Sequence, residues 1–400
     1  MSQFSVPCAV YRGGTSRGLF FHEKDLPDNQ REIEEIFLQG IDAYNPSQVN
    51  GLGSGTSHTS KVVVIGPPSV EGADVDYTFF QIGIAEEIVD SEGTCGNLMA
   101  AVGPFAVDEG LVEVPQGAES VTVYAFNTNI GKMIRLQVPV SNPAASAGLV
   151  NLPTSTGSNR PSARTSGDYL MPGLRLPGAK IVVDILSPGG GKTGYTLPAG
   201  KVADLHTEGK GHAASLIDLV NPFVYIEAES LGLEGQELFN DLTARPGLLE
   251  LLEVMRREGS CRMGLKQTVE AAALSKAIPK IAIVASPMDY TTSSGKRIAK
   301  DDVDIVAKMV SMNRFHRTFA GSGLYNLAAA CLLPGTVPNR CSNLSASTEE
   351  RIIRIGHPDG IAEVRVRLTQ DLQDVDYVGL DRTARRIMKG DLYIPESYDA

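Results

Sequence analysis

Two segments of this chain are apolar on every side of a helix and consist largely of small residues. They are Cys95–Asp108 (CGNLMAAVGPFAVD) and Gly323–Leu333 (GLYNLAAACLL). A helix without a polar face must be enclosed by protein. Each segment follows a glycine-bearing turn, and one lies in each half of the chain. The sequence therefore predicts a duplicated architecture in which each half wraps a sheet around a central helix. Two unrelated core helices in one large domain would give the same pattern.

Most of the remaining sequence is typical of short strands between turn residues, rich in valine, isoleucine, tyrosine and phenylalanine. The predicted strands are Ala9–Tyr11, Gly18–Phe21, Lys61–Ile65, Tyr77–Ile82, Val121–Tyr124, Met133–Pro139, Lys180–Leu186, Phe223–Ile226, Lys280–Ala285 and Glu363–Leu368. Helical periodicity predicts amphipathic helices at Gln30–Gly40, Pro246–Gly259 and Ala299–Met309. A Ser/Pro/Gly-rich stretch, Asn142–Asp168, predicts a long loop. The fold class is α+β, with a first lobe at 1–184 and a second at 185–379.

Charge and cysteine content exclude several classes of protein. The formal net charge is -11, which argues against nucleic acid or an anionic membrane as partner, because both need a basic face. The 5 cysteines are widely spaced and form no C-x-x-C pair or Cys/His cluster, so we expect neither a disulfide framework nor a structural metal. The N-terminal sequence has no secretory signal, and no apolar run has transmembrane length. We expect a protein of the cytoplasm or of an organelle.

The first candidate site is Thr94-Cys95-Gly96-Asn97, at the start of the first enclosed segment. A thiol there would meet unpaired backbone N–H groups and the positive end of a helix dipole, which favour the thiolate. Gly96 would let a ligand approach the backbone closely, and the neighbouring N–H groups suit a carboxylate or enolate oxygen. A buried structural cysteine would give the same pattern.

The second candidate is Lys61, which ends the loop Gly51–Lys61 (GLGSGTSHTSK) and begins a strand. A lysine that is partly desolvated or close to another cation releases its proton more easily and can act as a base. The alternative is a solvated lysine at a strand end. We interpret His58 in the same loop as a plain loop histidine.

Two arginine-bearing segments could grip carboxylates. Arg12–Gly18 (RGGTSRG) is a glycine-rich turn with two guanidinium groups and two hydroxyls, the donors that a carboxylate needs. Arg314–Arg317 (RFHR) lies just before the turn Ala320–Gly323 and suits a second carboxylate pocket, or else a solvated basic turn. In that turn Ser322 occupies the place that Cys95 has in the first half.

The sequence lacks the motifs of several other classes of enzyme. Ser187–Gly194 (SPGGGKTG) is no P-loop, because G-x-x-x-x-G-K-[ST] would need glycine where Leu186 stands, and we interpret it as a hinge. There is no G-x-S-x-G elbow and no H-E-x-x-H pair. A dinucleotide-binding G-x-G-x-x-G between strand and helix is also absent.

Five motifs together resemble the PrpF family, which comprises 2-methylaconitate cis-trans isomerases and relatives acting on aconitate, methylitaconate or oxalomesaconate. They are RGGTSRGLFF, HTSKVVVIG, GTCGNLMAAVGPFAVDEGLV, SPGGGKTGYTLPAGK and HRTFAGSGLYNLAAACLLPGTV. A more distant resemblance links Cys95-Gly96-Asn97 to diaminopimelate epimerase. The resemblance implies two lobes, each a β-barrel-like sheet around a central buried helix near 95–108 or 323–333. It also implies a C-terminal return of 380–400 to the first lobe and a site in the cleft between lobes.

By the same motif matches, Lys61 corresponds to the family's catalytic lysine and Cys95 to its partner thiol. Proton abstraction next to a conjugated carboxylate needs no metal or organic cofactor, so we expect none. The expected substrate contacts are Ser16, Arg17, Ser60, Gly96, Asn97, Arg317, Gly321 and Ser322.

One departure matters, because two-base racemases of this fold have a second cysteine where this chain has Ser322. A two-thiol racemase is therefore disfavoured. The expected partner is a small polycarboxylate, with a homo-oligomer and a functional pairing with an aconitase-like hydratase left open. A non-catalytic substrate-binding partner of such a hydratase and a one-thiol epimerase are the alternatives.

Overall fold

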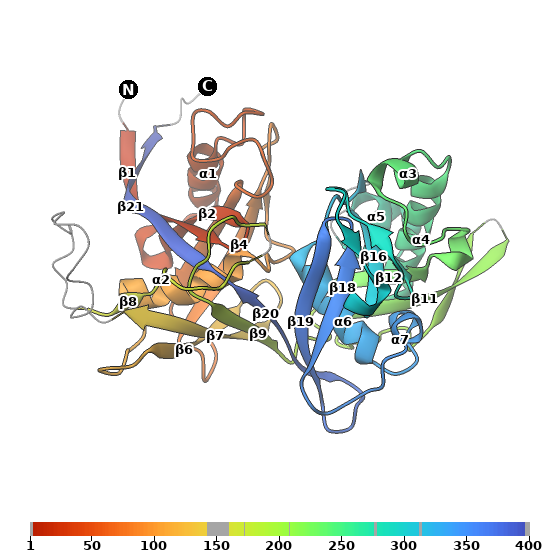
Figure 1. Cartoon of the computed structure of the whole chain (residues 1–400). Coiled ribbons are helices and arrows are strands. Elements are labelled where there is room, and N and C mark those ends of the chain that lie inside the picture. Colours follow the sequence, from red (N-terminus) through yellow and green to blue (C-terminus); the bar gives the residue numbers. More distant parts are fainter. Residues whose placement is uncertain are drawn as a thin grey trace. The chain divides into compact units, whose positions relative to one another are not determined.

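The predicted strands are all present in the computed structural model, which describes residues 3–141, 160–171, 173–207, 209–275, 278–311 and 314–396. Residues 142–159 of the predicted long loop lie outside these ranges. The chain folds into two compact units, which are described separately (Figure 1). Unit 1 is Met1–Asp184 with Asp381–Ala400, and unit 2 is Ile185–Leu380.

Unit 1 is a mainly antiparallel sheet with two parallel crossovers. Its strands are β1 (Gln3–Gly13), β2 (Ser16–His22), β3 (Lys61–Gly66), β4 (Val75–Ile82), β5 (Val89–Asp90), β6 (Ser120–Asn127), β7 (Lys132–Ser141), β8 (Ser162–Ala163) and β21 (Ala384–Pro395). Its helices are η1 (Glu23–Asp25), α1 (Gln30–Ile41), η2 (Leu98–Ala101) and α2 (Val102–Glu109). The pairs β2–β3 and β4–β6 are parallel, with α1 and then η2 and α2 in the crossovers. The C-terminal strand β21 pairs antiparallel along the length of β1.

The sheet of unit 1 is covered on both faces. Successive strand residues point to opposite sides, so each strand offers apolar side chains to both. On one face Leu19 and Phe21 pack in a cluster with Phe37 of α1. On the other face Phe20 lies against Phe105 of α2, with ring centroids 5.6 Å apart. Every residue from Leu98 to Val107 is buried, so the predicted enclosed segment is enclosed.

The enclosed segment begins as a helix later than predicted. Cys95 precedes η2 by three residues, and the α-helix itself starts only at Val102. Pro104 lies in the first turn of α2, where its missing N–H is tolerated. The turn before α2 is the tighter 3₁₀ form.

Unit 2 has its own sheet and its own enclosed helix. Its strands are β10 (Ala203–Thr207), β11 (Lys210–Leu219), β12 (Asn221–Glu227), β13 (Lys280–Ala285), β14 (Tyr290–Thr291), β15 (Arg297–Ile298), β16 (Ile305–Ser311), β17 (Arg314–Phe315), β18 (Arg351–His357) and β19 (Gly360–Leu368). Its helices are η4 (Glu229–Leu231), α3 (Phe239–Thr243), α4 (Leu248–Arg262), α5 (Val269–Leu274), η5 (Lys300–Asp302), α6 (Gly321–Leu332) and α7 (Val337–Ser342). The boundaries between the units fall within β9 (Ile181–Leu186) and β20 (Val375–Arg382).

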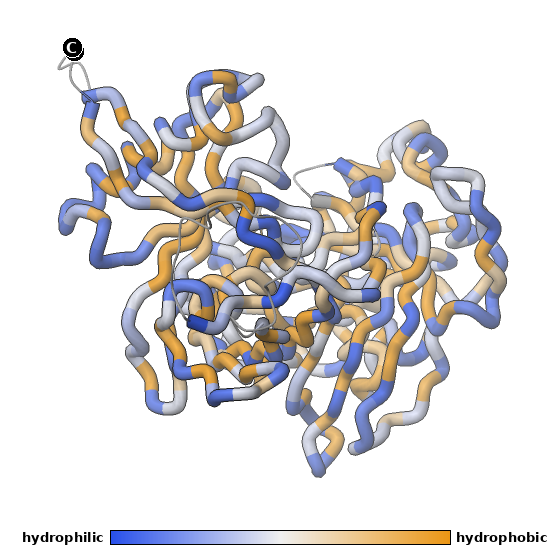
Figure 2. The backbone as a smooth tube through the Cα atoms, turned by 60° about the vertical axis from the view of Figure 1, so that its left-hand side comes forward, coloured by the Kyte–Doolittle hydropathy of each residue, from blue (hydrophilic) through white to orange (hydrophobic). Residues whose placement is uncertain are grey.

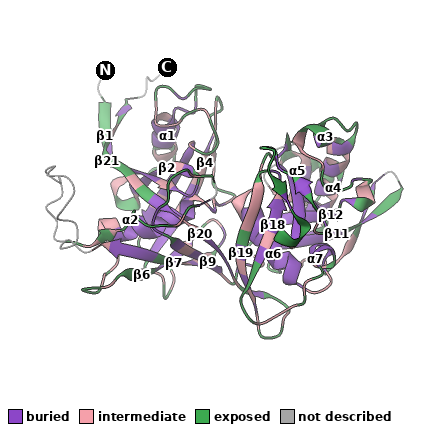
Figure 3. Cartoon of the chain, viewed as in Figure 1, coloured by how far each residue is buried: buried purple, intermediate pink, exposed green. Residues whose placement is uncertain are grey.

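The topology of unit 2 repeats that of unit 1. The successive pairs β11–β12, β12–β13, β13–β16, β16–β18 and β18–β19 are antiparallel, parallel, antiparallel, parallel and antiparallel. The pairs β1–β2, β2–β3, β3–β4, β4–β6 and β6–β7 follow the same order. In both units the second parallel crossover contains the enclosed helix, and α6 is buried from Ser322 to Leu332 (Figure 3).

Two of the three predicted amphipathic helices are confirmed as α1 and α4, and the third is wrong. Residues 299–309 form the short turn η5 and strand β16 instead. This strand is buried on both faces, so its sequence is a nearly continuous apolar run rather than an alternating one. In several places along the chain, hydrophilic and hydrophobic residues do alternate (Figure 2).

Candidate active site

Two glycine-bearing turns of unit 1 dock on each other. A Cβ atom at Gly13 would lie 2.6 Å from the carbonyl oxygen of Asn97. Gly14 has a left-handed backbone, with φ at 54°, and a Cβ there would collide with the Asn97 side chain. The Arg12–Gly18 turn therefore needs its two glycines to reach the Cys95 turn.

The Cys95 thiol is half-buried where these turns meet. It donates a long hydrogen bond to the Ser16 hydroxyl, with Sγ and Oγ 3.9 Å apart. The backbone N–H of Leu98, the first residue of η2, donates to Sγ over 3.5 Å. The structure therefore places a backbone N–H at the thiol, although the α-helix predicted there begins later.

Asn127 fixes the Cys95 turn through a hydrogen bond to Thr94, the residue before Cys95. Its buried Nδ2 donates to the Thr94 hydroxyl over 2.7 Å and to the Tyr77 hydroxyl over 2.6 Å. Asn127 ends β6 and was not predicted as part of the site. Its type and position carry no local signal, because only the β4–β6 pairing brings it to the turn.

Lys61 lies on the same face of the sheet as Ser16. Leu19 of β2 pairs with Val62 of β3, so the preceding residues Gly18 and Lys61 share the opposite face. A Cβ atom at Gly18 would lie 2.8 Å from both the Lys61 carbonyl and the side chain of Leu98. This face is the one that α2 covers, and the Cys95 turn leads into that helix.

Lys61 is 8% exposed. Its Nζ donates to Gln81 Oε1 over 2.5 Å and lies 5.1 Å above the Phe79 ring. Within the described residues, no carboxylate is paired with this ammonium. Partial burial and the positive charge of Lys61 lower the pKa of His58. The position suits a proton-transferring amine near an anionic substrate.

The two arginines that were predicted to bind a carboxylate in the first turn donate to backbone carbonyls of this chain. Arg17 Nη2 donates to the Leu52 carbonyl over 3.0 Å. Arg12 Nη1 donates to the carbonyls of Gly14 and Thr383 over 2.8 and 2.9 Å. Both guanidinium groups thus brace the turn, and Arg17 keeps further N–H donors for a ligand.

Ser60 is fully buried, and its hydroxyl donates to Gln48 Oε1 and to the Thr56 carbonyl. These contacts hold the loop before Lys61, and Ser60 stays a prediction as a substrate contact. Gly96 is buried within the turn. Asn97 Nδ2 donates to the Thr15 hydroxyl, and its Oδ1 accepts from Arg382 Nε over 3.1 Å.

Arg382 is a cation at this turn that the sequence did not reveal. It comes from the C-terminal part of unit 1, 285 residues beyond Asn97. No local pattern marks it, since the return of the chain end to unit 1 brings it there. It adds a guanidinium beside the Cys95 turn, where an anionic ligand would be favoured.

The other predicted substrate contacts, Arg317, Gly321 and Ser322, lie in unit 2. Gly321 and the buried Ser322 begin α6 after the N-cap residue Ala320. The guanidinium of Arg317 lies 5.1 Å from the centre of the Phe239 ring. Within unit 1, the structure brings Ser16 to the Cys95–Asn97 turn and places Lys61 on the same face of the sheet. Arg17 follows Ser16 along β2, so its side chain stands on the opposite face.

The glycine-rich segment Ser187–Gly194 has no free cradle for phosphate. Asp218, fully buried, accepts from the N–H groups of Lys192 and Thr193 over 2.8 and 2.6 Å. These are N–H groups that a phosphate would need. The geometry therefore agrees with the rejection of a P-loop.

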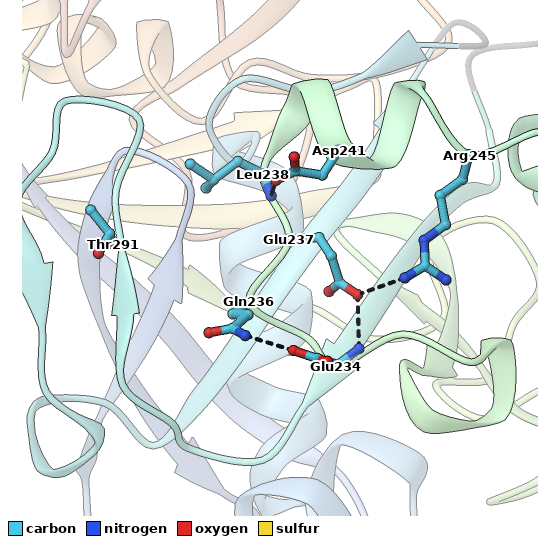
Figure 4. Close-up of a pocket in the computed structure, with 7 residues that line it drawn as sticks. All are labelled: Glu234, Gln236, Glu237, Leu238, Asp241, Arg245 and Thr291. Carbon is cyan, nitrogen blue, oxygen red and sulfur yellow. Dashed lines mark hydrogen bonds and ion pairs between the residues drawn. The ribbon is translucent and has the colours of Figure 1, made fainter.

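A cavity of about 410 Å³ in unit 2 suits an anion poorly (Figure 4). It is lined by Glu234, Gln236, Glu237, Leu238, Asp241, Arg245 and Thr291. Its one cationic side chain, Arg245, is paired with Glu237 at 3.5 Å. Across the described ranges, no group of three or more potential metal-ligating side chains occurs, and no helix combines the length and apolarity needed to cross a bilayer.

Comparisons with known proteins cover almost the whole chain. A family model described as PrpF protein matches residues 3–395. The chain is 34% identical to the 3-methylitaconate isomerase of Eubacterium barkeri over 398 residues, covering 99% of this chain and 98% of that protein. It is 33% identical to the 2-methyl-aconitate isomerase of Shewanella oneidensis, with 98% of each chain covered.

Two solved structures bear on the fold. A methylitaconate-delta-isomerase matches with a TM-score of 0.84 and 32% identity, covering 100% of this chain and 99% of that one. A hydroxyproline epimerase from Agrobacterium vitis matches with a TM-score of 0.51 and 11% identity, covering 100% and 94%. The second similarity concerns the fold alone.

Proposed function

This chain belongs to the PrpF family of isomerases, and we propose that it isomerises a small unsaturated di- or tricarboxylate such as methylitaconate, methylaconitate or aconitate. The resemblance to this family is thereby confirmed. The observation that carries the proposal is the position of Lys61. Lys61 is buried and forms no ion pair with a carboxylate of the described residues, and it stands on the sheet face that also bears Ser16 and the Cys95 turn.

In the proposed reaction, the uncharged amine of Lys61 removes a proton from an allylic carbon of the substrate. The electron pair of that C–H bond enters the conjugated system, giving a dienolate-like anion. Backbone N–H groups at the Cys95 turn and the guanidinium of Arg382 would stabilise the negative charge. Reprotonation by the Cys95 thiol, or by Lys61, gives a shifted double bond or, after bond rotation, the other geometric isomer.

The carboxylate-binding roles are also proposals. Ser16 lies at the Cys95 turn, to which Gly96 and Asn97 belong, and Arg17 stays a prediction as a substrate contact because its side chain stands on the opposite face of the sheet. Arg317, Gly321 and Ser322 stay predictions as substrate contacts from unit 2. We further propose that each unit is a β-barrel-like sheet around its central helix, as in diaminopimelate epimerase. The repeated strand order and the similarity to an epimerase support this description.

The test starts with proton NMR of the wild-type protein and aconitate, methylaconitate, methylitaconate or oxalomesaconate in deuterated water. We expect one of these acids to isomerise and to exchange its allylic hydrogen without added cofactor. Lys61→Ala should abolish both turnover and exchange, because it removes the amine proposed as the base. Lys24→Ala, at an exposed lysine of the same unit, is the matched control.

Exchange that persists in Lys61→Ala would remove Lys61 from the mechanism. A wild-type protein that isomerises none of these acids, but needs a hydratase for activity, would favour the non-catalytic partner. Incorporation of deuterium into an amino or hydroxy acid would instead favour an epimerase. Cys95→Ser should slow product formation more than exchange if the thiol returns the proton.

A further inference from the structure

We propose that Gln81 is a positioning residue that holds the Lys61 amine in place as a base. Gln81 lies directly opposite Lys61 in the β3–β4 pair, so both side chains stand on the face that α2 covers. The hydrogen bond from Nζ to Gln81 Oε1 is 2.5 Å long. This inference rests on the proposed role of Lys61 as base and extends it to a residue that the sequence did not suggest.

The orientation of the Gln81 amide is set by its other end. Its Nε2 donates to the Ser60 carbonyl over 2.8 Å, with longer contacts to the carbonyls of Ser57 and Ile82. The reverse orientation would point the amide oxygen at these carbonyls and the amide N–H groups at the ammonium. Oε1 must therefore face Lys61, and the loop before Lys61 locks it there.

An amide differs from a carboxylate at this place. A carboxylate within hydrogen-bond distance would hold the proton on the lysine and oppose its action as a base. A neutral amide oxygen orients the amine without adding negative charge. The Phe79 ring, 5.1 Å from Nζ, supplies a second uncharged contact from the same strand. Gln81 thus orients Lys61 without placing a negative charge beside it.

The decisive variant is Gln81→Glu, which keeps the size of the side chain and adds the charge. We expect it to retain the proton on Lys61 to higher pH, by about 1–3 pH units. The first measurement is competitive acetylation of Lys61 against pH, quantified by mass spectrometry. The second is the acid limb of the profile of kcat/KM against pH, which should move by the same amount. Gln137→Glu, at an exposed position on β7, adds the same charge elsewhere in unit 1 and is the control.

Gln81→Met is a second variant that tests the same role if Gln81→Glu does not fold. It removes the acceptor while keeping a side chain of similar length. We expect kcat to fall about 10- to 100-fold with KM within about twofold, because the amine loses its orientation rather than its substrate. A merely structural glutamine would lower the melting temperature in both variants and leave the kcat of folded Gln81→Met at the wild-type value.

The acetylation experiment does not depend on turnover. An unchanged midpoint in Gln81→Glu overturns the positioning role, whatever the activity of the wild type. A wild type that isomerises none of the acids, combined with the expected shift in midpoint, would overturn the proposed function and keep the contact. A wild-type kcat in Gln81→Met would also refute the assignment.

Discussion

Replacing Glu109 by glutamine should weaken the attachment of the C-terminal strand to unit 1 in a pH-dependent manner. Glu109 is the last residue of α2, and its side chain is 8% exposed. It accepts from Lys389 over 2.6 Å and from Arg386 over 3.3 Å, both on β21. His22 of β2 lies 3.3 Å away. The carboxylate therefore joins the enclosed helix to two strands of the sheet.

The size of the effect follows from the carboxyl group. The hydrogen bond with His22 and the ammonium of Lys389 lower the pKa of Glu109 from 4.5 to about 2, against the opposing effect of burial. A full shift of this size corresponds to about 3 kcal/mol of stability. Because Lys389 is 54% exposed, solvent screens part of it, and we expect about 2 kcal/mol.

The sign of the pH dependence is set by the lowered pKa. The ionised carboxylate contributes fully above about pH 4.5, and its contribution fades as the pH falls towards 2. Glu109→Gln should therefore be less stable than the wild type at pH 7 and equally stable near pH 2.

Urea titrations followed by circular dichroism would measure the free energy of unfolding at pH 7, 5, 4 and 3. Hydrogen exchange of peptides from α2 would assign the transition to unit 1. Glu113→Gln, at an exposed carboxylate nearby, should change neither. A loss of stability in Glu109→Gln that is the same at every pH, or no loss at pH 7, would refute the electrostatic reasoning.

Two further substitutions, one in each unit, test contacts that hold the backbone of that unit in place. Gly13→Ala places a Cβ 2.6 Å from the Asn97 carbonyl, so it should lower the free energy of unfolding by about 1–3 kcal/mol and change the reactivity of Cys95 towards a thiol reagent. An unaltered thiol reactivity would show that the two turns are not coupled. Asn326→Leu removes a buried amide that donates to three backbone carbonyls and accepts from Tyr225, and should cost about 3 kcal/mol or more in a urea titration. A cost below about 1 kcal/mol would mean that water replaces the amide.

The strands and enclosed helices were predictable because they depend on local composition. Runs of β-branched and aromatic residues between turn residues marked the strands, and apolar segments of small residues marked η2 with α2 and α6. The wrong prediction of a helix at residues 299–309 also arises from local composition. A strand buried on both faces shows no alternation, and Lys308 within it mimics the polar side of a helix.

The candidate site was predictable only where its residues stand in motifs. Lys61 and Cys95 lie in glycine-bearing segments whose composition is unusual, and these segments drew attention to both. Gln81, Asn127 and Arg382 carry no such mark. Gln81 and Asn127 reach the site through the β3–β4 and β4–β6 pairings, and Arg382 reaches it through the return of the chain end to unit 1, so no local pattern marks them.

The sequence by itself determined which chemical groups are available: an amine at the start of a strand, a thiol in a glycine-bearing turn, and arginines in a chain of net charge -11. It also determined which segments had to be enclosed, since burial of an apolar surface depends on side chains alone. The tertiary structure decided which of these groups share one face. Register decides this, because a shift of one residue sends a strand's side chains to the opposite side of the sheet. That is why Lys61 meets a neutral amide instead of a carboxylate, and why two of the arginines brace a turn.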